Sequence, residues 1–324
     1  MKLLITGGAG YIGSHVALAA LDRGYEVTVF DDLSTGLEEN IIDDTSFIKG
    51  STCSKSDLAN LLSQVRYDGV IHLAASKAAG ESMLKTRKYS ENNIIGGINL
   101  INACIDYDIK LFVFSSTAAI YGKPDYCPVD EKHPLSPNNY YGYTKLAIEN
   151  NLKWLSELKD IRYAALRYFN AAGYDINRRI SGKEISPKNL IPIIMETAIG
   201  LRQKVSIFGN DYYTKDGTAI RDYIHVNDLA RAHINSIEYL STQKKNLIIN
   251  LGSGVGYSVL EVVNRIAQIS NKKIEYDFQE RRLGDSDRLI AKSDLAKKLI
   301  GWETKYSDLN TIIKSSWEVY KNNQ

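Results

Sequence analysis

The stretch TGGAGYIG, at residues 6–13, decides the fold of this chain. Residues 2–6, just before it, form an apolar run that predicts a buried β-strand. After it, apolar residues recur at helical spacing between Ile12 and Ala20, which predicts a helix packed on that strand. A strand, a glycine-rich turn and a helix in this order indicate the first unit of a parallel α/β sheet.

Three glycines, Gly7, Gly10 and Gly13, occupy the turn itself. The first suits a tight turn, the second lets the backbone approach a pyrophosphate, and the third allows close helix–strand packing. An acidic residue, Asp31, follows about 20 residues later, where it can accept from a ribose 2′-hydroxyl. Taken singly, an ordinary strand–helix turn and a surface aspartate are the alternatives. Together these residues predict bound NAD, since a carboxylate repels the 2′-phosphate of NADP.

The same alternation continues through the first half of the chain. Buried strands are predicted at residues 26–30, 69–73, 110–115 and 162–167, and helices at residues 55–64, 89–107 and 141–159. Strands that alternate with crossover helices form a parallel sheet with helices on both faces. We therefore expect an α/β protein whose residues 1–169 form a Rossmann-type doubly wound parallel sheet.

The pattern changes after Phe169, where the loops become rich in Gly, Asn, Asp and Tyr. We expect residues 170–324 to form mainly a smaller mixed α/β domain that binds the substrate. Residues 226–240 look helical and residues 247–251 look like a buried strand, so about 224–256 should return to the first domain. Two domains agree with the length of the chain, at ~150 residues per domain.

Composition limits the partners and the location. The 324 residues carry 40 Lys and Arg against 38 Asp and Glu, a net charge of +2, with no long basic run. We therefore expect no nucleic-acid partner and no membrane partner. No apolar run approaches the ~20 residues of a membrane span. No charged and apolar leader precedes Lys2, so we expect a cytoplasmic protein.

Cysteine usage agrees with that location. Cys53, Cys104 and Cys127 show no metal-ligand spacing, and an odd number of cysteines cannot form a complete set of disulfides. We expect all three to be reduced and mostly buried thiols, and we expect no metal site.

A tyrosine and a lysine stand four residues apart in the segment from Tyr141 to Lys145. On a helix such side chains share one face. A free phenol, with a pKa of about 10, is a poor base near neutral pH, and a nearby ammonium stabilises the phenolate. Tyr140 and Tyr143 lie close by, but the spacing to the lysine favours Tyr141 as the proton shuttle. An exposed helix surface is the alternative for the pair alone.

A hydroxyl side chain, Thr117, follows the buried strand predicted at residues 110–115. Ligands of open α/β sheets gather at the carboxyl ends of the strands. Thr117 can there hydrogen-bond both a substrate hydroxyl and the tyrosine oxygen. A turn in which the hydroxyl satisfies its own backbone is the alternative.

Taken together, these segments resemble the extended short-chain dehydrogenase/reductase family, and within it the UDP-glucose 4-epimerase family. The resemblance extends from Gly7 to about Trp302. It rests on TGGAGYIGSH (6–15), FDDLSTG (30–36), KAAGES (77–82), FSSTAAIYG (114–122), YYGYTK (140–145), LRYFNAAG (166–173), FGNDYYTKDGT (208–218) and RDYIHVNDLA (221–230). The last three segments are specific to this family, whereas the first is shared with many dinucleotide-binding enzymes.

The resemblance implies a role for each matched position. Catalysis is expected from Thr117, Tyr141 and Lys145. NAD is expected to contact Gly7, Gly10, Tyr11, Ile12, Gly13, Asp31, Asp32, Leu33, Ser34, Thr35, Gly36, Ser51, Thr52, Leu73, Ala74, Ala75, Lys77, Asn92, Tyr141, Lys145 and Phe169. The UDP-sugar is expected to contact Thr117, Tyr141, Asn170, Asn189, Leu190, Ser206, Ile207, Phe208, Arg221, Arg282, Asp285 and Leu289. The family also implies a homodimer.

The implied reaction inverts C4 of the hexose. Tyr141 removes the proton of the 4-hydroxyl, and a hydride moves transiently from C4 to NAD. The 4-keto sugar then rotates to present its other face, and the hydride and the proton return to it. UDP-glucose and UDP-galactose are thereby interconverted. Two alternatives stay open: a nucleotide-sugar 4,6-dehydratase, against which Ala118 and Ala119 count because elimination needs acids there, and a non-catalytic NAD(H)-sensing regulatory protein.

The chain departs from the family pattern at three positions. Ser51 follows Gly50 where an aspartate that meets the adenine amino group is usual, so that contact is in doubt. Thr117 stands where serine is also common, and either hydroxyl suits the reaction. Leu289 replaces a bulkier aromatic residue beside the sugar, so we expect activity on the UDP-N-acetylhexosamines as well.

Overall fold

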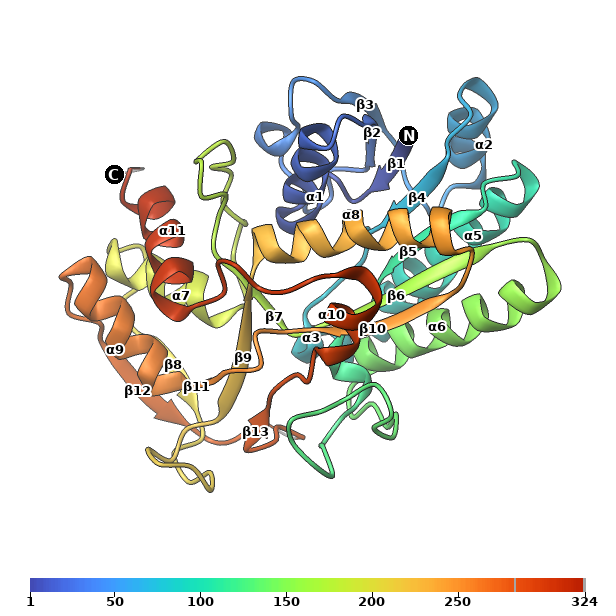
Figure 1. The fold of residues 1–324 in the computed structure, drawn as a ribbon. Helices are drawn as coiled ribbons and strands as arrows, with labels where there is room; N and C mark the ends of the chain where they lie inside the picture. The colour runs from blue at the N-terminus through green and yellow to red at the C-terminus, as the bar shows by residue number, and fades with distance from the viewer. Residues whose placement is uncertain (283, 323–324) are drawn as a thin grey trace.

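A seven-stranded parallel sheet forms the centre of the computed structural model, which describes residues 1–282 and 284–322 (Figure 1). The order is β10-β6-β5-β4-β1-β2-β3. These strands are β1 (Lys2–Thr6), β2 (Glu26–Asp31), β3 (Ser46–Lys49), β4 (Gly69–His72), β5 (Leu111–Ser115), β6 (Arg162–Tyr168) and β10 (Leu247–Leu251). The chain runs outward from β1 to β3 and then continues on the other side of β1, which confirms the predicted doubly wound sheet.

Helices cover both faces of this sheet (Figure 1). One face carries α1 (Tyr11–Asp22) and α8 (Val226–Gln243), and the other carries α2 (Lys55–Gln64), α5 (Gly96–Asp106) and α6 (Tyr140–Leu158). Successive side chains of a strand point to opposite faces. In β1, Leu3 and Ile5 accordingly join the core under α1 and α8, whereas Leu4 joins the core under the other three helices.

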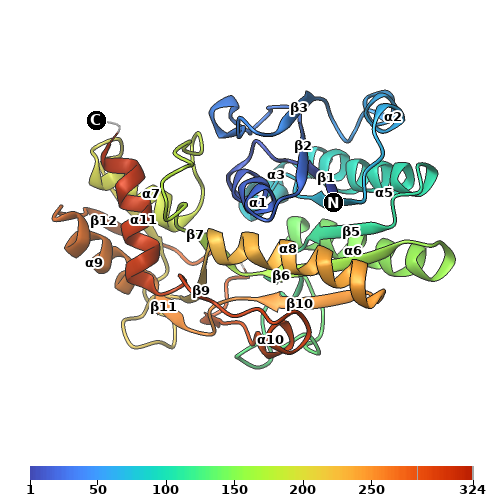
Figure 2. The same ribbon diagram turned by 45° about the horizontal axis from the view of Figure 1, so that its top comes forward.

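A smaller lobe stands beside the carboxyl ends of the large sheet (Figure 2). Its helices α7 (Leu190–Ala198), α9 (Val259–Ser270) and α11 (Leu309–Lys321) share one apolar core. Its strands are β7 (Asn170–Ala172), β8 (Val205–Phe208), β9 (Ile220–His225), β11 (Gly256–Ser258), β12 (Tyr276–Gln279) and β13 (Arg288–Leu289). The short helix α10 (Asp294–Ile300) instead packs on the core that contains α8.

The helix predicted over residues 89–107 is interrupted. The structure has α3 (Ala79–Leu84) and α4 (Thr86–Tyr89), then a π-helical turn at Ser90–Ile95 that leads into α5. Within that turn the Asn93 side chain accepts from Ser76 N at 2.8 Å and donates to Thr144 Oγ1 at 3.0 Å. These bonds tie the turn to the loop after β4 and to α6, and π-turns of this kind are frequent at functional sites.

The thiols differ from the prediction. All three are free, but only Cys104 is buried, between α5 and the sheet, whereas Cys53 and Cys127 are exposed. The prediction of mostly buried thiols is wrong because both exposed cysteines lie in irregular segments, where hydropathy gives no guide to burial. Every helix in the described ranges is too short or too polar to cross a membrane.

The contact between β1 and α1 leaves no space for side chains. Gly7 has a φ of +76°, and a Cβ on it would lie 2.5 Å from Ala74 N. A Cβ on Gly13 would lie 2.0 Å from the carbonyl oxygen of Gly7. The first turn of α1 therefore rests directly on the backbone of the glycine-rich turn.

We expect Gly13→Ala to lower the free energy of unfolding by about 1–3 kcal/mol, because backbone atoms must move to admit the methyl group. Gly80→Ala is the matched control, since a Cβ on Gly80 in α3 meets nothing within 4 Å. That control should be neutral or slightly stabilising. Chemical denaturation of both variants checks the prediction, and equal stability of the two would contradict it.

Candidate active site

The predicted cofactor residues follow the carboxyl ends of neighbouring strands. The glycine-rich turn follows β1. Residues 31–36 begin with the last residue of β2 and continue into the loop after it. Ser51 and Thr52 follow β3, and residues 73–77 follow β4. Phe169 follows β6, and Asn92 lies in the π-helical turn that is bonded to the loop after β4 through Ser76. Parallel pairing places all of these segments at one edge of the sheet.

The start of α1 is suited to an anion. Gly10 is the N-cap residue of α1 and has no side chain, so it caps none of the first N–H groups of the helix. A Cβ on Gly10 would approach only the Gly7 carbonyl oxygen, at 3.2 Å. Amide groups at a helix N-terminus, with no side chain in the way, match the pyrophosphate of a dinucleotide.

Asp31 anchors the neighbouring loop. Its two carboxylate oxygens accept from Ala9 N at 3.0 Å and from Leu33 N at 2.9 Å, and the residue is 7% exposed. Burial raises the pKa of this carboxyl, which the two amide bonds oppose. A carboxylate has about four lone-pair positions, so Asp31 can still accept from a ribose hydroxyl. These residues therefore fit a bound NAD.

Two other expected cofactor positions have protein partners. Lys77 pairs with Glu184 of the segment before α7, and its ammonium lies 5.9 Å from the centre of the Tyr11 ring. The Ser51 hydroxyl accepts from Cys53 N at 3.3 Å, and Ser51 N donates to Asp57 at 3.0 Å. The position that usually holds an aspartate is thus occupied by a short side chain already engaged with its own turn.

Tyr141 and Lys145 lie one turn apart at the start of α6. Asn139 caps this helix by accepting from Gly142 N at 2.9 Å. The Lys145 ammonium donates to the Ser115 carbonyl oxygen at 2.7 Å and lies 5.9 Å from the centre of the Tyr141 ring. The predicted helix over 141–159 is confirmed with its boundaries shifted by one residue.

Burial opposes the charged forms of both side chains. It lowers the pKa of Lys145 to about 7, against a raising effect of the Glu149 carboxylate. It raises the pKa of Tyr141 to about 12, against a lowering effect of the Thr117 hydroxyl. An adjacent positive charge, such as an oxidised nicotinamide ring, would favour the phenolate.

The Thr117 hydroxyl can cap its own backbone turn and still bond Tyr141 or a substrate. Its Oγ1 accepts from Ala119 N at 3.1 Å, which caps the short 3₁₀ turn Ala118–Ile120. The hydroxyl hydrogen is not used by that bond and can be donated to Tyr141 or to a substrate oxygen. Thr117 is 8% exposed at the carboxyl end of β5.

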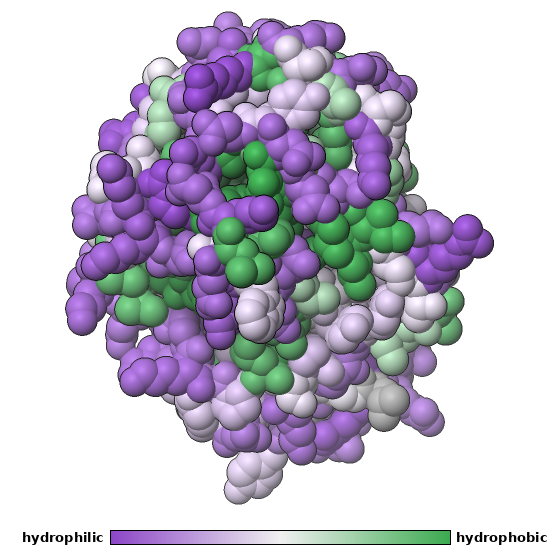
Figure 3. All heavy atoms as spheres, turned by 90° about the vertical axis from the view of Figure 1, so that its right-hand side faces the viewer, coloured by the Kyte–Doolittle hydropathy of each residue, from purple (hydrophilic) through white to green (hydrophobic). Residues whose placement is uncertain are grey.

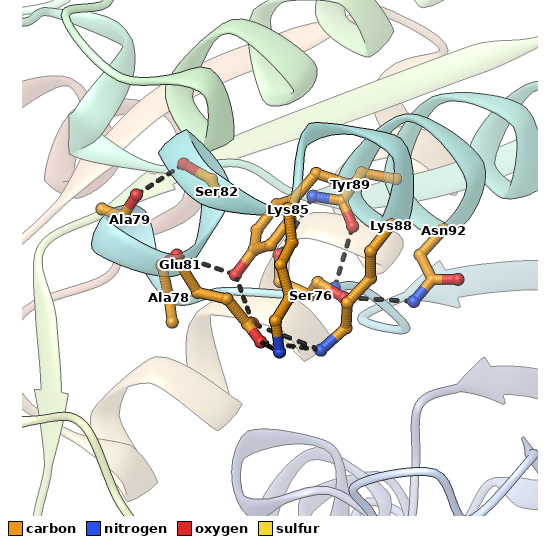
Figure 4. A network of polar contacts seen from close by, with 10 residues as sticks. Ser76, Ala78, Ala79, Glu81, Ser82, Lys85, Lys88, Tyr89 and Asn92 are labelled. Carbon is orange, nitrogen blue, oxygen red and sulfur yellow. Dashed lines mark hydrogen bonds and ion pairs between the residues drawn. The ribbon is translucent and has the colours of Figure 1, made fainter.

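The helix pair α3–α4 braces the start of α6. Figure 4 shows the ammonium groups of Lys85 and Lys88 converging on the Glu81 carboxylate, at 3.0 and 3.2 Å. The Tyr89 hydroxyl donates to the same carboxylate at 3.1 Å and to Ala78 O at 2.7 Å. Ser82, also in α3, donates to Ala79 O at 2.5 Å and accepts from Tyr141 N at 3.0 Å. The KAAGES segment therefore fixes the backbone of Tyr141.

Most of the expected substrate residues belong to the smaller lobe. Asn189 is the N-cap of α7 without a side-chain cap bond, and Leu190 begins that helix. Asn170 opens β7 and donates to Asp222 O at 2.8 Å. Arg221, in β9, donates to Ser286 O at 2.9 Å.

Two arginines are available for a diphosphate. The Arg282 guanidinium lies 3.9 Å from the centre of the Phe208 ring, and Arg221 lies 3.7 Å from the Asp285 carboxylate. Guanidinium groups match phosphate oxygens in a forked geometry. Asn138, just before α6, donates to Gly284 O at 2.6 Å and so connects the Arg282–Asp285 segment to the catalytic helix.

Not every expected side chain points toward a ligand. Ile207 is 1% exposed in the core of the smaller lobe, so only its backbone can reach a nucleotide. The Ser206 hydroxyl donates to Asp277 at 3.1 Å across the β8–β12 pair. Leu289 pairs with Arg221 in register and packs on the cluster that contains Ala118 and Phe169. That contact places Leu289 beside the catalytic strand end.

Sequence reasoning missed two buried charged residues, Glu149 and Arg167, which form an ion pair at 2.6 Å behind Lys145. Both side chains are 4% exposed. A usable signal existed, since Glu149 stands four residues after Lys145, on the same helix face, and Arg167 interrupts an apolar strand.

The comparisons with known proteins agree with this geometry. Residues 3–252 match the NAD dependent epimerase/dehydratase family. The chain belongs to this family.

Individual relatives cover nearly the whole chain. A UDP-glucose 4-epimerase of Halalkalibacterium halodurans is 44% identical over 322 residues, which are 99% of this chain and 96% of the relative. A solved UDP-glucose 4-epimerase from Brucella ovis, in complex with NAD, is 39% identical with a TM-score of 0.95 over 98% of each chain. A UDP-Glc/GlcNAc 4-epimerase from Campylobacter jejuni is 37% identical with a TM-score of 0.86 over 99% of each chain.

We expect the purified protein to carry NAD, because the turn after β1 and the Asp31 carboxylate suit a dinucleotide without a 2′-phosphate. Denaturing the protein and analysing the supernatant by chromatography should release NAD(H). Recovery of NADP alone, or a preference for NADP on reconstitution, contradicts the assignment.

Proposed function

We propose that this chain is a UDP-glucose 4-epimerase, which interconverts UDP-glucose and UDP-galactose. The observation that carries the proposal is the meeting of Thr117, Tyr141 and Lys145 at the sheet edge that also holds the glycine-rich turn. The smaller lobe contributes Arg221 and Arg282, two groups suited to a diphosphate. Relatives at about 40% identity over the full length carry this activity in their names.

Tyr141 is the proton shuttle of the reaction. Its oxygen takes the proton of the sugar 4-hydroxyl, and Thr117 donates a hydrogen bond that stabilises the developing phenolate and orients the hydroxyl. Lys145 holds a positive charge beside the ring, fixed by its bond to the Ser115 carbonyl oxygen. NAD, held by the glycine-rich turn and Asp31, would supply the acceptor for the C4 hydride.

Inversion requires that the hexose turn over while the nucleotide stays bound. Arg221 and Arg282 hold the diphosphate, and Asp285 contacts the nucleotide. The hexose side of the site offers the apolar Leu289 and the neutral side chains of Asn170 and Asn189. A firm grip on UDP with few fixed bonds to the sugar permits the rotation.

The two alternative functions are less well supported. A 4,6-dehydratase needs acids after Thr117, where Ala118 and Ala119 stand in the 3₁₀ turn. A non-catalytic NAD(H) sensor has no use for a buried lysine held beside a tyrosine.

We further propose a homodimer in the cytoplasm, with neither nucleic acid nor membrane as a partner. Figure 3 shows apolar clusters on the face that forms the right-hand side of Figure 1. Trp154 and Leu158 of α6 are 65% and 68% exposed, which suits a helix-mediated interface. Residues 1–169 with about 224–256 form the cofactor domain in this proposal, because β10 pairs with β6, and residues 170–324 mainly form the UDP-sugar domain.

Tyr141→Phe keeps the ring and removes the ionisable oxygen, so epimerisation of UDP-glucose should fall by about 10²–10⁴-fold. NAD content should stay normal. Tyr143→Phe is the matched control, since Tyr143 lies on the same helix, 51% exposed, and stacks on Tyr140. Activity of Tyr141→Phe close to that of the control shows that another group moves the proton. A wild-type protein that converts no UDP-hexose refutes the proposed function itself.

Leu289 should widen the substrate range. It is smaller than the aromatic residue of some relatives, and it packs beside Ala118 and Phe169 near the reacting edge. The unmodified protein should therefore epimerise UDP-N-acetylglucosamine as well as UDP-glucose. Leu289→Tyr should lose the N-acetyl activity and keep the glucose activity, because a group that cannot fit is rejected strongly. Assays of both proteins on both substrates check this, and a wild type inactive on the N-acetyl sugar refutes it.

A further inference from the structure

A buried ion pair lies directly behind the catalytic side chains. Arg167, in β6, donates to both carboxylate oxygens of Glu149 in α6, with Nη2 at 2.6 Å from Oε2 and Nε at 3.1 Å from Oε1. Both side chains are 4% exposed. A forked pair of this kind fixes direction as well as distance. The pair therefore sets how α6 sits against the end of β6.

Each partner of the pair makes one further hydrogen bond to a neighbouring element. The Ser116 hydroxyl donates to the Glu149 carboxylate, and Ser116 immediately precedes Thr117. On the other side, Arg167 Nη1 donates to the Tyr121 hydroxyl at 3.1 Å, which donates to Asn250 at 2.6 Å. The network thus spans α6, the turn after β5, β6 and β10.

Glu149 also stands one helical turn after Lys145, on the same buried face of α6. Two adjacent residues at the end of β5 are therefore bonded to this one helix face. Lys145 bonds the Ser115 carbonyl oxygen, and Glu149 receives the Ser116 hydroxyl. A displacement of Glu149 must move Thr117 relative to Tyr141.

We propose that Glu149, held by Arg167, is a positioning residue of the proposed epimerase reaction: it fixes Thr117 through Ser116, and it stands one helical turn behind Lys145 on the same buried face of α6. The proposal rests on the proposed function, since it assigns these residues to the same proton transfer. No expected cofactor or substrate contact involves either partner, so neither is a catalytic residue.

The charge of Glu149 acts in a defined direction. Burial lowers the pKa of Lys145 to about 7, and the Glu149 carboxylate raises it. The other groups that face Lys145 are the Tyr141 and Phe114 rings, the Ser115 carbonyl and His72, whose pKa burial and the lysine lower to about 3. A neutral His72 supplies no charge, so the raising effect on the Lys145 pKa comes from the Glu149 carboxylate.

The surroundings of Glu149 itself contain the Arg167 guanidinium, the hydroxyls of Ser116 and Tyr163, and Lys145. Without the Glu149 charge, Lys145 loses its proton at lower pH. Above that pH the Tyr141 oxygen has no neighbouring cation, so proton transfer from the sugar hydroxyl slows. The alkaline limb of the kcat profile should therefore move to lower pH, while proton transfer becomes slower throughout.

Three variants separate positioning from folding. Glu149→Gln removes the charge and leaves Arg167 buried without a counter-ion, which destabilises the fold. The double variant Glu149→Leu with Arg167→Met replaces the pair by apolar groups, which is often neutral or stabilising. Asp228→Asn is the matched control, because Asp228 is a fully buried carboxylate paired with Arg231 at the start of α8.

For both Glu149 variants we expect kcat on UDP-glucose to fall by about 10²-fold, the loss typical of misplaced reacting groups, with KM changed less than about twofold. The double variant should regain the thermal stability lost in Glu149→Gln without regaining kcat. Asp228→Asn should lose stability yet keep the wild-type kcat and pH profile. Recovery of kcat together with stability in the double variant would show a merely structural role and overturn the proposal.

A second measurement does not depend on turnover. The carbon-13 chemical shift of the Lys145 Cε, assigned by its loss in Lys145→Met, reports the ionisation of Lys145. This titration should move to lower pH in both Glu149 variants, because the carboxylate that favours the ammonium is gone, and stay unchanged in Asp228→Asn. An unmoved titration overturns the proposal. Failure of the wild type to epimerise any UDP-hexose instead removes the proposed function, and the titration still tests whether Glu149 acts on Lys145.

Discussion

The parallel register of the central strands is the constraint on which the rest of the molecule depends. β1, β4, β5 and β6 pair so that Thr6 lies beside His72, His72 beside Phe114, and Ser115 beside Leu166. Since parallel strands share one direction, each chain segment leaves the sheet at the same edge. Groups as distant in sequence as the glycine-rich turn and Phe169 therefore meet, and a covering helix can reach several strand ends at once.

The parts of this arrangement that were predictable from sequence are local. The glycine-rich turn shows in the sequence because the backbone contact of Gly13 with Gly7 excludes every side chain, so residue type and conformation are tied together. Tyr141 and Lys145 are detectable because four residues is one helical turn. The alternation of strands and helices follows equally directly, since strands buried on both faces read as apolar runs.

The parts that escaped prediction depend on contacts distant in sequence. The π-helical turn exists because Asn93 must reach both Ser76 and Thr144, which no helical periodicity records. Ile207 is a position that the resemblance assigns to the UDP-sugar, yet its side chain belongs to the core of the smaller lobe. Glu149 and Arg167 are individually charged residues in apolar elements, and only the folded sheet shows that each supplies the other's counter-ion.

Burial creates the central electrostatic problem of the site. Burial disfavours the charged forms of both side chains, since it lowers the pKa of Lys145 to about 7 and raises that of Tyr141 to about 12. In the proposed mechanism, charges on two sides oppose this effect of burial. The Glu149 carboxylate favours the charged form of Lys145, and the Lys145 ammonium, together with an oxidised cofactor, would favour the phenolate of Tyr141. Arg167 in turn donates to both oxygens of that carboxylate, so a residue of β6 outside the expected ligand contacts holds Glu149 in place behind Lys145.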